Sequence, residues 1–197
     1  METHATDTAV RKLKRLLPLV FVMLAACDDP FGPNHWIAFQ DTLVMYSASR
    51  AEYVGLGSVL DAVADPVTVL PIEIPGATGN WDLVLIDEGS GLSLVPAGAL
   101  TGLESNRARL AVLEGRDFET LEEAPSDTTR YSAGPVPLRL GVVYVLRTRK
   151  GPCGLTSGYR YAKLKPLAID VARGTFRFVV TRNPYCDDRS LVPPDDD

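Results

Sequence analysis

The chain has 197 residues, of which 46% are hydrophobic and 23% are charged, and its formal net charge is −5. This length and composition fit one domain with its own hydrophobic core. The negative charge favours a soluble domain and argues against a nucleic-acid partner.

The N-terminal 26 residues have the layout of an export signal. A cluster of four basic residues at 11–15 precedes 11 apolar residues at 16–26, which are too few to cross a bilayer as a helix. The motif Leu24-Ala25-Ala26-Cys27 resembles the lipobox of bacterial lipoproteins. The resemblance implies a signal peptide at 1–26, cleavage before Cys27 and diacylation of its thiol. Two acyl chains would make a stable membrane anchor. The alternatives are an ordinary signal peptide and a buried N-terminal helix.

The predicted anchor defines the rest of the organisation. We expect an exported protein held by lipid in the bacterial cell envelope, although the sequence does not decide between the inner and the outer membrane. Residues 27–35, with two prolines and a glycine, form the predicted tether. Residues 36–191 form the predicted single domain, and 192–197 form an acidic tail.

The domain has the sequence pattern of strands. Pro71 interrupts one apolar segment and predicts an edge strand or a bulge there. The runs at 81–86 and 92–95 are joined by a glycine-containing loop and predict a hairpin. The run at 140–148 is apolar on both faces, which is typical of a central strand. The other predicted strands are 42–46, 67–70, 72–74 and 108–113, while 54–62 and 96–103 are expected to hold a turn or a short helix.

The clearest unit is a long hairpin over 159–181. Phe176, Phe178 and Val180 fall on one face by period two, and the link 170–174 suits a turn with Gly174 at positive φ. Long helical periodicity is absent. The predicted fold class is therefore all-β, an antiparallel sandwich or a curled sheet with a long C-terminal hairpin.

The cysteine count favours one disulfide. With Cys27 acylated, Cys153 and Cys186 remain in a chain exported to an oxidising compartment. They flank the long hairpin at its open end, so we predict that they pair. A metal site is the alternative, but it lacks a fourth ligand and CxxC spacing.

Charge is divided unevenly along the chain. Residues 139–182 contain ten Lys or Arg and one acid, whereas 27–138 contain five basic and 17 acidic residues. A basic face for an anionic ligand is one interpretation, and pairing between the two halves of the domain is the favoured one. The candidate ligand-binding residues are Tyr144, Tyr159, Tyr161, Lys163 and Arg177.

No catalytic or nucleotide-binding motif stands out. His35 is the one histidine of residues 27–197, and no Ser-His-Asp set, P-loop or HExxH is found. We therefore predict a non-enzymatic protein without a metal or another cofactor. An envelope hydrolase that uses paired carboxylates is kept as an alternative, with Asp82, Asp87, Glu88, Glu122 and Glu123 as the available acids.

Four short motifs, in order over residues 60–182, resemble the HmuY-like bacterial lipoproteins. They are Trp81-Asp82-Leu83-Val84, the strand 143–148, the segment 158–164 and Gly174-Thr175-Phe176-Arg177-Phe178. The resemblance implies an all-β, lipid-anchored architecture. Haem binding in the family's type member uses two histidines, and a single histidine cannot supply that pair. We therefore predict a binding module for a small ligand or an envelope partner. A haem or tetrapyrrole carrier is kept as an alternative.

Overall fold

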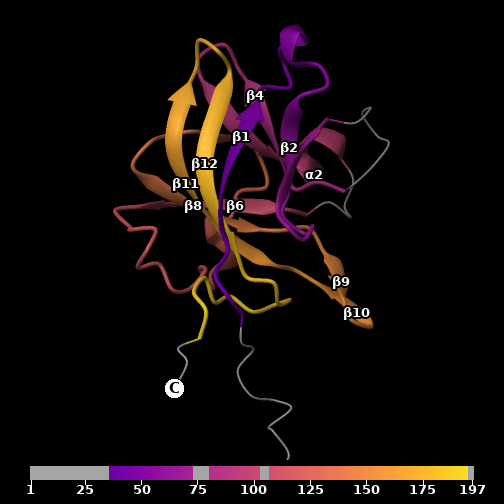
Figure 1. Ribbon diagram of the computed structural model, residues 1–197, viewed down its shortest axis with the longest axis vertical. Coiled ribbons are helices and arrows are strands. Elements are labelled where there is room, and N and C mark those ends of the chain that lie inside the picture. The colour runs from indigo at the N-terminus through magenta and orange to yellow at the C-terminus, as the bar shows by residue number, and fades with distance from the viewer. Residues whose placement is uncertain (1–35, 73–79, 103–106, 195–197) are drawn as a thin grey trace, which may run out of the picture. The chain divides into compact units, whose positions relative to one another are not determined.

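The computed structural model describes residues 36–72, 80–102 and 107–194 (Figure 1). The predicted signal peptide, Cys27 and His35 lie outside the described residues, as do most of the predicted strand at 72–74 and the end of the acidic tail. In the part of the chain that is described, no helix has the length and apolar character needed to span a bilayer.

Two five-stranded antiparallel sheets make up the domain (Figure 1). The first sheet has the order β1 (Gln40–Tyr46), β12 (Thr175–Arg182), β11 (Tyr161–Asp170), β8 (Val142–Arg147), β6 (Arg109–Glu114). The second has the order β3 (Thr68–Pro71), β2 (Gly57–Asp61), β4 (Leu83–Asp87), β5 (Leu92–Pro96), β7 (Val136–Pro137). The remaining elements are η1 (Ala51–Tyr53), α2 (Ala97–Thr101), η2 (Thr128–Arg130) and a small hairpin of β9 (Gly151–Cys153) and β10 (Thr156–Gly158). The all-β sandwich is confirmed.

The main core lies between the two sheets because their strands alternate. Phe176, Phe178 and Val180 of β12 point inward with Met45 of β1, and all four are almost completely buried. The two phenylalanine rings stack with their centroids 4.7 Å apart. Leucines of β4 and β5 complete this core from the second sheet.

The outer face of each sheet is also covered over its central strands. On the first sheet, the loop after β6 brings Phe118 and Tyr131 onto Val143 and Val145 of β8, and Leu191 of the C-terminal segment joins them. On the second sheet, Trp81 packs with Val59, Val84, Val95 and Ala97. Central strands are therefore buried on both faces, which explains their nearly continuous apolar sequences.

Most predicted elements are confirmed. The long hairpin is β11–β12, with Gly174 in its turn at a φ of 64°. β8 lies inside the first sheet, β3 is an edge strand, and β4–β5 form the predicted hairpin. The short helix expected within 96–103 is α2.

One predicted element is wrong. The segment 54–62 was expected to hold a turn or a short helix, but Gly57–Asp61 forms β2. Ser58, Val59 and Leu60 are all buried because β2 lies between β3 and β4 and both of its faces are covered. A strand buried on both faces shows no alternation in its sequence, so its period could not be recognised.

Phe178→Ala tests the core. Phe178 is fully buried between the sheets, so its truncation should lower the free energy of unfolding by about 3–5 kcal/mol. Arg177→Ala is the matched control, since Arg177 is exposed on the opposite face of β12 and its loss should change stability by about 0.5 kcal/mol at most. Urea unfolding followed by tryptophan fluorescence measures both, and equal effects would contradict the inward placement of Phe178.

Candidate functional site

The turn that follows β2 is held in place by a buried carboxylate. Asp82, which is fully buried, accepts hydrogen bonds from the backbone N–H groups of Ala62 at 2.8 Å and Arg149 at 2.7 Å. Its Oδ2 also accepts from Nη1 of Arg149 at 3.0 Å. Burial raises the pKa of Asp82, and the positive charge of Arg149 opposes that rise.

Arg149 joins a second carboxylate to the first. Its Nη1 lies 3.0 Å from Oδ1 of Asp61, the last residue of β2. The same Oδ1 accepts the N–H groups of Val63 and Ala64, each at 3.0 Å. The turn is thus fixed to β4 and to the chain segment after β8, both of which lie far away in sequence.

Arg182 fixes the same turn from the first sheet. Its Nη1 donates to the carbonyl oxygens of Ala62, Val63 and Ala64 at 3.3, 3.1 and 2.8 Å. Its Nη2 lies 3.1 Å from Oδ1 of Asp65. The guanidinium is nearly buried, and all of these contacts are directed at one turn. The turn is therefore rigid, and so is the surface that it builds.

That surface is one wall of a hollow at the open edge of the sandwich, where β1 and β3 are the edge strands. The hollow has a volume of about 600 Å³. Its apolar lining comes from Ile37 and Phe39 before β1, from Pro66 and Val67 before β3, and from Val180 of β12. Ile37 and Phe39 are 90% and 68% exposed, which is unusual for large apolar side chains beside one another.

The polar groups of the hollow carry unequal charge. The charge of Arg182 is offset by Asp65, and its Nη1 is directed at three carbonyl groups of the turn. Asp41 of β1 lines the same hollow, and its side-chain carboxylate has no hydrogen-bond or ion-pair partner among the described residues. The site therefore offers apolar walls and one unpaired carboxylate, an arrangement that complements an apolar molecule with a cationic end.

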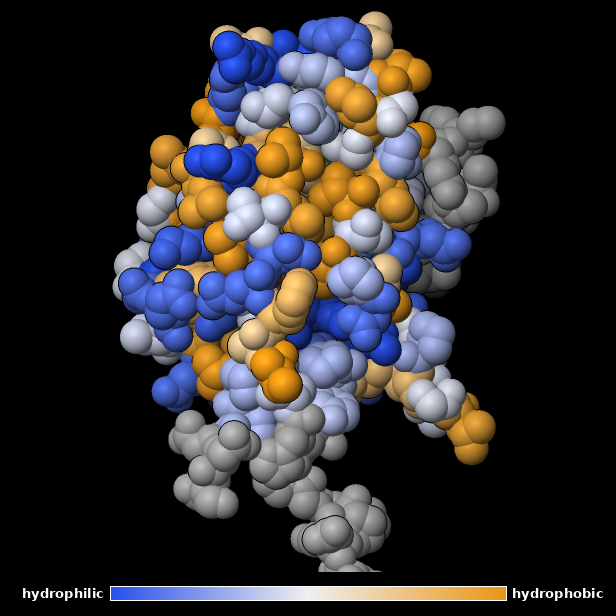
Figure 2. Space-filling view, in the orientation of Figure 1, coloured by the Kyte–Doolittle hydropathy of each residue, from blue (hydrophilic) through white to orange (hydrophobic). Residues whose placement is uncertain are grey.

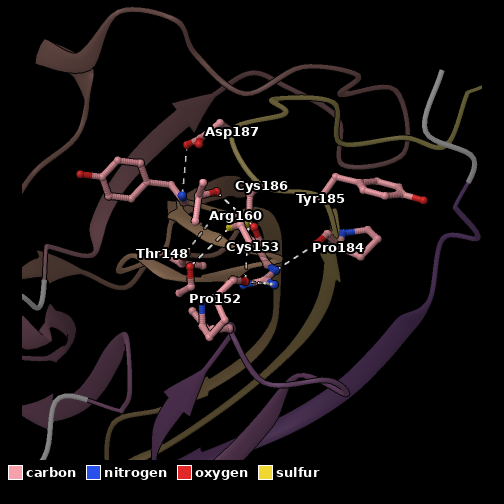
Figure 3. Close-up of a disulfide and its surroundings, with 12 residues drawn as sticks. Thr148, Pro152, Cys153, Arg160, Pro184, Tyr185, Cys186 and Asp187 are labelled. Carbon is pink, nitrogen blue, oxygen red and sulfur yellow. Dashed lines mark hydrogen bonds between the residues drawn. A yellow bond between two sulfur atoms is a disulfide. The ribbon is translucent and has the colours of Figure 1, made fainter. Parts of the chain in front are cut away.

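The predicted disulfide is present and ties the β9–β10 hairpin to the segment after β12 (Figure 3). Arg160 lies beside it and donates to the carbonyl oxygens of Pro184 and Pro152, each at 2.9 Å. The backbone N–H of Tyr159 donates to Oδ1 of Asp187 at 3.1 Å. The hairpin base is thus held by one covalent bond and three hydrogen bonds.

Two of the predicted ligand-binding residues do not reach the surface. Tyr144 is fully buried between the sheets, and its hydroxyl donates to the carbonyl of Pro137 and accepts from the N–H of Arg139. Lys163 is 3% exposed, and its Nζ donates to the carbonyl oxygens of Phe118 and Leu121 at 2.7 and 3.1 Å. Burial lowers the pKa of Lys163. Both residues are explained by packing and hydrogen bonding inside the domain.

The other three do not come together. Tyr159 and Tyr161 are half-buried beside Arg147, whose guanidinium carbon lies 4.6 Å from the centroid of the Tyr159 ring. Arg177 is exposed on the outer face of β12, opposite Val44 of β1. The five residues therefore form no common site, and the hollow at the sandwich edge contains none of them.

Part of the division of charge is explained by pairing between the two halves of the chain. Arg149 binds Asp61 and Asp82, Arg182 binds Asp65, and other pairs are Arg139–Glu114, Lys165–Glu119 and Arg189–Glu123. Most of these pairs join loops or strand ends, whereas neighbouring strands were expected to provide them. Within 36–72, 80–102 and 107–194, no three His, Cys, Asp or Glu side chains gather in an arrangement suited to a metal ion.

Comparison with known proteins adds no relative. No family model, curated protein or solved structure matches the chain. The resemblance to the HmuY-like lipoproteins therefore stays a prediction from the four motifs.

Sequence reasoning missed the hollow. Its lining comes from three separate segments, and no spacing in the chain connects them. One signal was present: Ile37 and Phe39 precede the first strand and alternate with polar or small residues without belonging to a core strand. The Trp81-Asp82 pair was noted for its strand, but the role of Asp82 as a buried acceptor was not predicted.

Arg149→Met tests the buried ion cluster. Removal of the guanidinium leaves two buried carboxylates without their positive partner, which should cost about 3–5 kcal/mol of unfolding free energy. Lys150→Met is the control, because Lys150 is exposed and only its contact with the Tyr159 ring is lost, worth about 1 kcal/mol at most. Chemical denaturation of both variants measures the difference, and similar losses would show that the cluster does not hold the turn.

Proposed function

We propose that this protein is a lipid-anchored binding module of the bacterial cell envelope, without enzymatic activity. Its site is the hollow at the open edge of the sandwich. The observation that carries the proposal is an apolar hollow of about 600 Å³ whose lining includes the carboxylate of Asp41, which no described residue pairs with.

The size and rigidity of the hollow support a binding role. Ligand sites in proteins usually have volumes of roughly 300–1,000 Å³, are mostly apolar and contain a few polar groups that orient the ligand. The wall at Asp65, Pro66 and Val67 directly follows the turn at 61–64, which Asp82, Arg149 and Arg182 fix before any ligand arrives. A preformed wall lowers the entropy cost of binding.

The charges select the ligand class. Arg182 is a weak attraction for an anionic group, because Asp65 offsets its charge and its Nη1 is directed at the carbonyl groups of the turn. The carboxylate of Asp41 is available to a ligand. It favours a cationic group that lies close to the apolar side chains of Ile37 and Phe39. The proposed ligand is therefore a small molecule with an apolar body and an amine or another cationic head.

The haem alternative has little support from the described residues. Met45 is the one methionine of residues 27–197, and its side chain is fully buried in the core between the sheets. Ligation of iron by its sulfur would require the sheets to separate at that point. Among the described residues, no histidine, cysteine, methionine or tyrosine lines the hollow.

Decylamine and decanoate test the ligand class, since they share one apolar chain and differ in the charge of the head. Isothermal titration below the micellar concentrations should show binding of decylamine and weaker binding of decanoate. Asp41→Asn should weaken decylamine binding about two- to fivefold, the effect of one solvent-accessible ion pair.

Thr42→Ala is the matched control for Asp41→Asn. Thr42 is the next residue of β1 and is exposed on the opposite face, so its replacement should leave both affinities unchanged. Equal binding of the two probes, or no binding of either, would refute the proposed ligand class.

The anchor has its own test. The intact mass of protein extracted from membranes should correspond to a chain that begins at a diacylated or further acylated Cys27. Cys27→Ser should move the protein from the membrane fraction to the soluble fraction. A mature chain that begins at any other residue, or an unmodified Cys27, would contradict the anchor while leaving the ligand titration unaffected.

A further inference from the structure

The β9–β10 hairpin projects from one end of the sandwich (Figure 1). Its strands are paired from Gly151–Gly158 to Cys153–Thr156, so Gly154 and Leu155 alone make the turn. Gly154 has a φ of 62°, as the first central residue of such a two-residue turn often requires. This turn places Leu155 at the tip.

Leu155 is the most exposed large apolar side chain among the described residues, with a relative exposure of 106%. Figure 2 shows its hairpin ending in an apolar tip that stands clear of the surrounding surface. The disulfide and the hydrogen bonds of Arg160 keep the base of the hairpin from folding back. The exposure of the leucine is thus maintained by the fold.

Cationic and aromatic groups lie behind the tip. Nζ of Lys150 is 5.5 Å from the centroid of the Tyr159 ring, and the guanidinium carbon of Arg147 is 4.6 Å from it. Lys150 is itself exposed. An apolar tip backed by a tyrosine and basic side chains suits the boundary of a bilayer, where aromatic rings and cations meet lipid headgroups.

The tip lies at the same end of the sandwich as the beginning of β1. The hairpin follows the end of β8 and precedes the start of β11, and that start lies beside the end of β12. Gln40, the first residue of β1, pairs with Thr181 near the end of β12. The exposed Ile37 and Phe39 precede Gln40 and are therefore near this end as well.

The chain between Cys27 and Trp36 is too short to let this end move far from an anchor. Nine Cα–Cα steps span at most about 32 Å, whatever conformation they adopt. A lipid on Cys27 therefore holds this end of the domain near the bilayer surface.

From these observations we propose that the β9–β10 hairpin is a membrane-docking element. It inserts Leu155 into the lipid bilayer and orients the sandwich on the membrane. The proposal rests on the lipid anchor of the proposed function. It is independent of the hollow and its ligand. The partner is the bilayer itself, with Leu155 among the acyl chains and Lys150 at the headgroups.

Brominated lipids test the depth of the tip. Both sheets, the core and the disulfide lie within residues 36–194, so a chain that begins at Cys27 contains the whole folded domain. Cys27 lies outside the disulfide and can be coupled through its thiol to a maleimide lipid in phosphatidylcholine vesicles. In Leu155→Trp, brominated acyl chains should quench the emission added by the new tryptophan and unbrominated lipid should shift that emission to shorter wavelength.

Leu140→Trp is the matched control. Leu140 is also an exposed leucine, but it precedes β8 at the opposite end of that strand, away from the hairpin. Its added emission should be neither quenched nor shifted, and the unmodified protein supplies the background of Trp36 and Trp81. Equal quenching in the two variants, or none in Leu155→Trp, would overturn the docking proposal.

The chemical coupling separates this result from the other proposals. Because the maleimide lipid replaces natural acylation, failure of the docking proposal cannot arise from failure of the predicted anchor. The titration with decylamine is performed without vesicles and reports on the hollow alone. Unchanged urea unfolding of both tryptophan variants verifies that exposed positions were replaced without loss of the fold.

Discussion

The contact of Arg149 with Asp82 and Asp61 is the interaction on which the arrangement of the domain depends. Asp82 is fully buried and uses both oxygens, so its charge is tolerable only because Arg149 and two backbone N–H groups surround it. This cluster joins β2, β4 and the segment after β8. It therefore fixes the second sheet to the end of the first sheet.

The proposed ligand site and the proposed docking end are both consequences of that attachment. The turn held by the cluster and by Arg182 becomes a wall of the hollow, and the same end of the sandwich carries the disulfide-bound hairpin. A hollow near the proposed docking end would meet molecules at the membrane surface.

Local patterns explain how much of the fold could be predicted. The alternation in Thr175–Arg182 and the glycine turn before it define the long hairpin, and the cysteines flanking that hairpin define the disulfide. The pattern failed for β2, where burial of both faces removes the period of two. It also failed for the candidate site, since Tyr144 and Lys163 are buried by contacts that strand periodicity does not record.

The sequence by itself determined most of the strands, the long hairpin and the pairing of Cys153 with Cys186, because each depends on neighbouring residues or on a count. The lipobox at Cys27 stays a prediction of the same local kind. Only the tertiary structure decided the partners of the buried charges: Arg149 meets Asp82 across 67 residues, and Lys163 meets Phe118 across 45. It also decided which apolar side chains stay exposed at the hollow and at the hairpin tip. The physical reason is that burial and charge pairing are properties of surfaces brought together by the fold, and no local spacing encodes them.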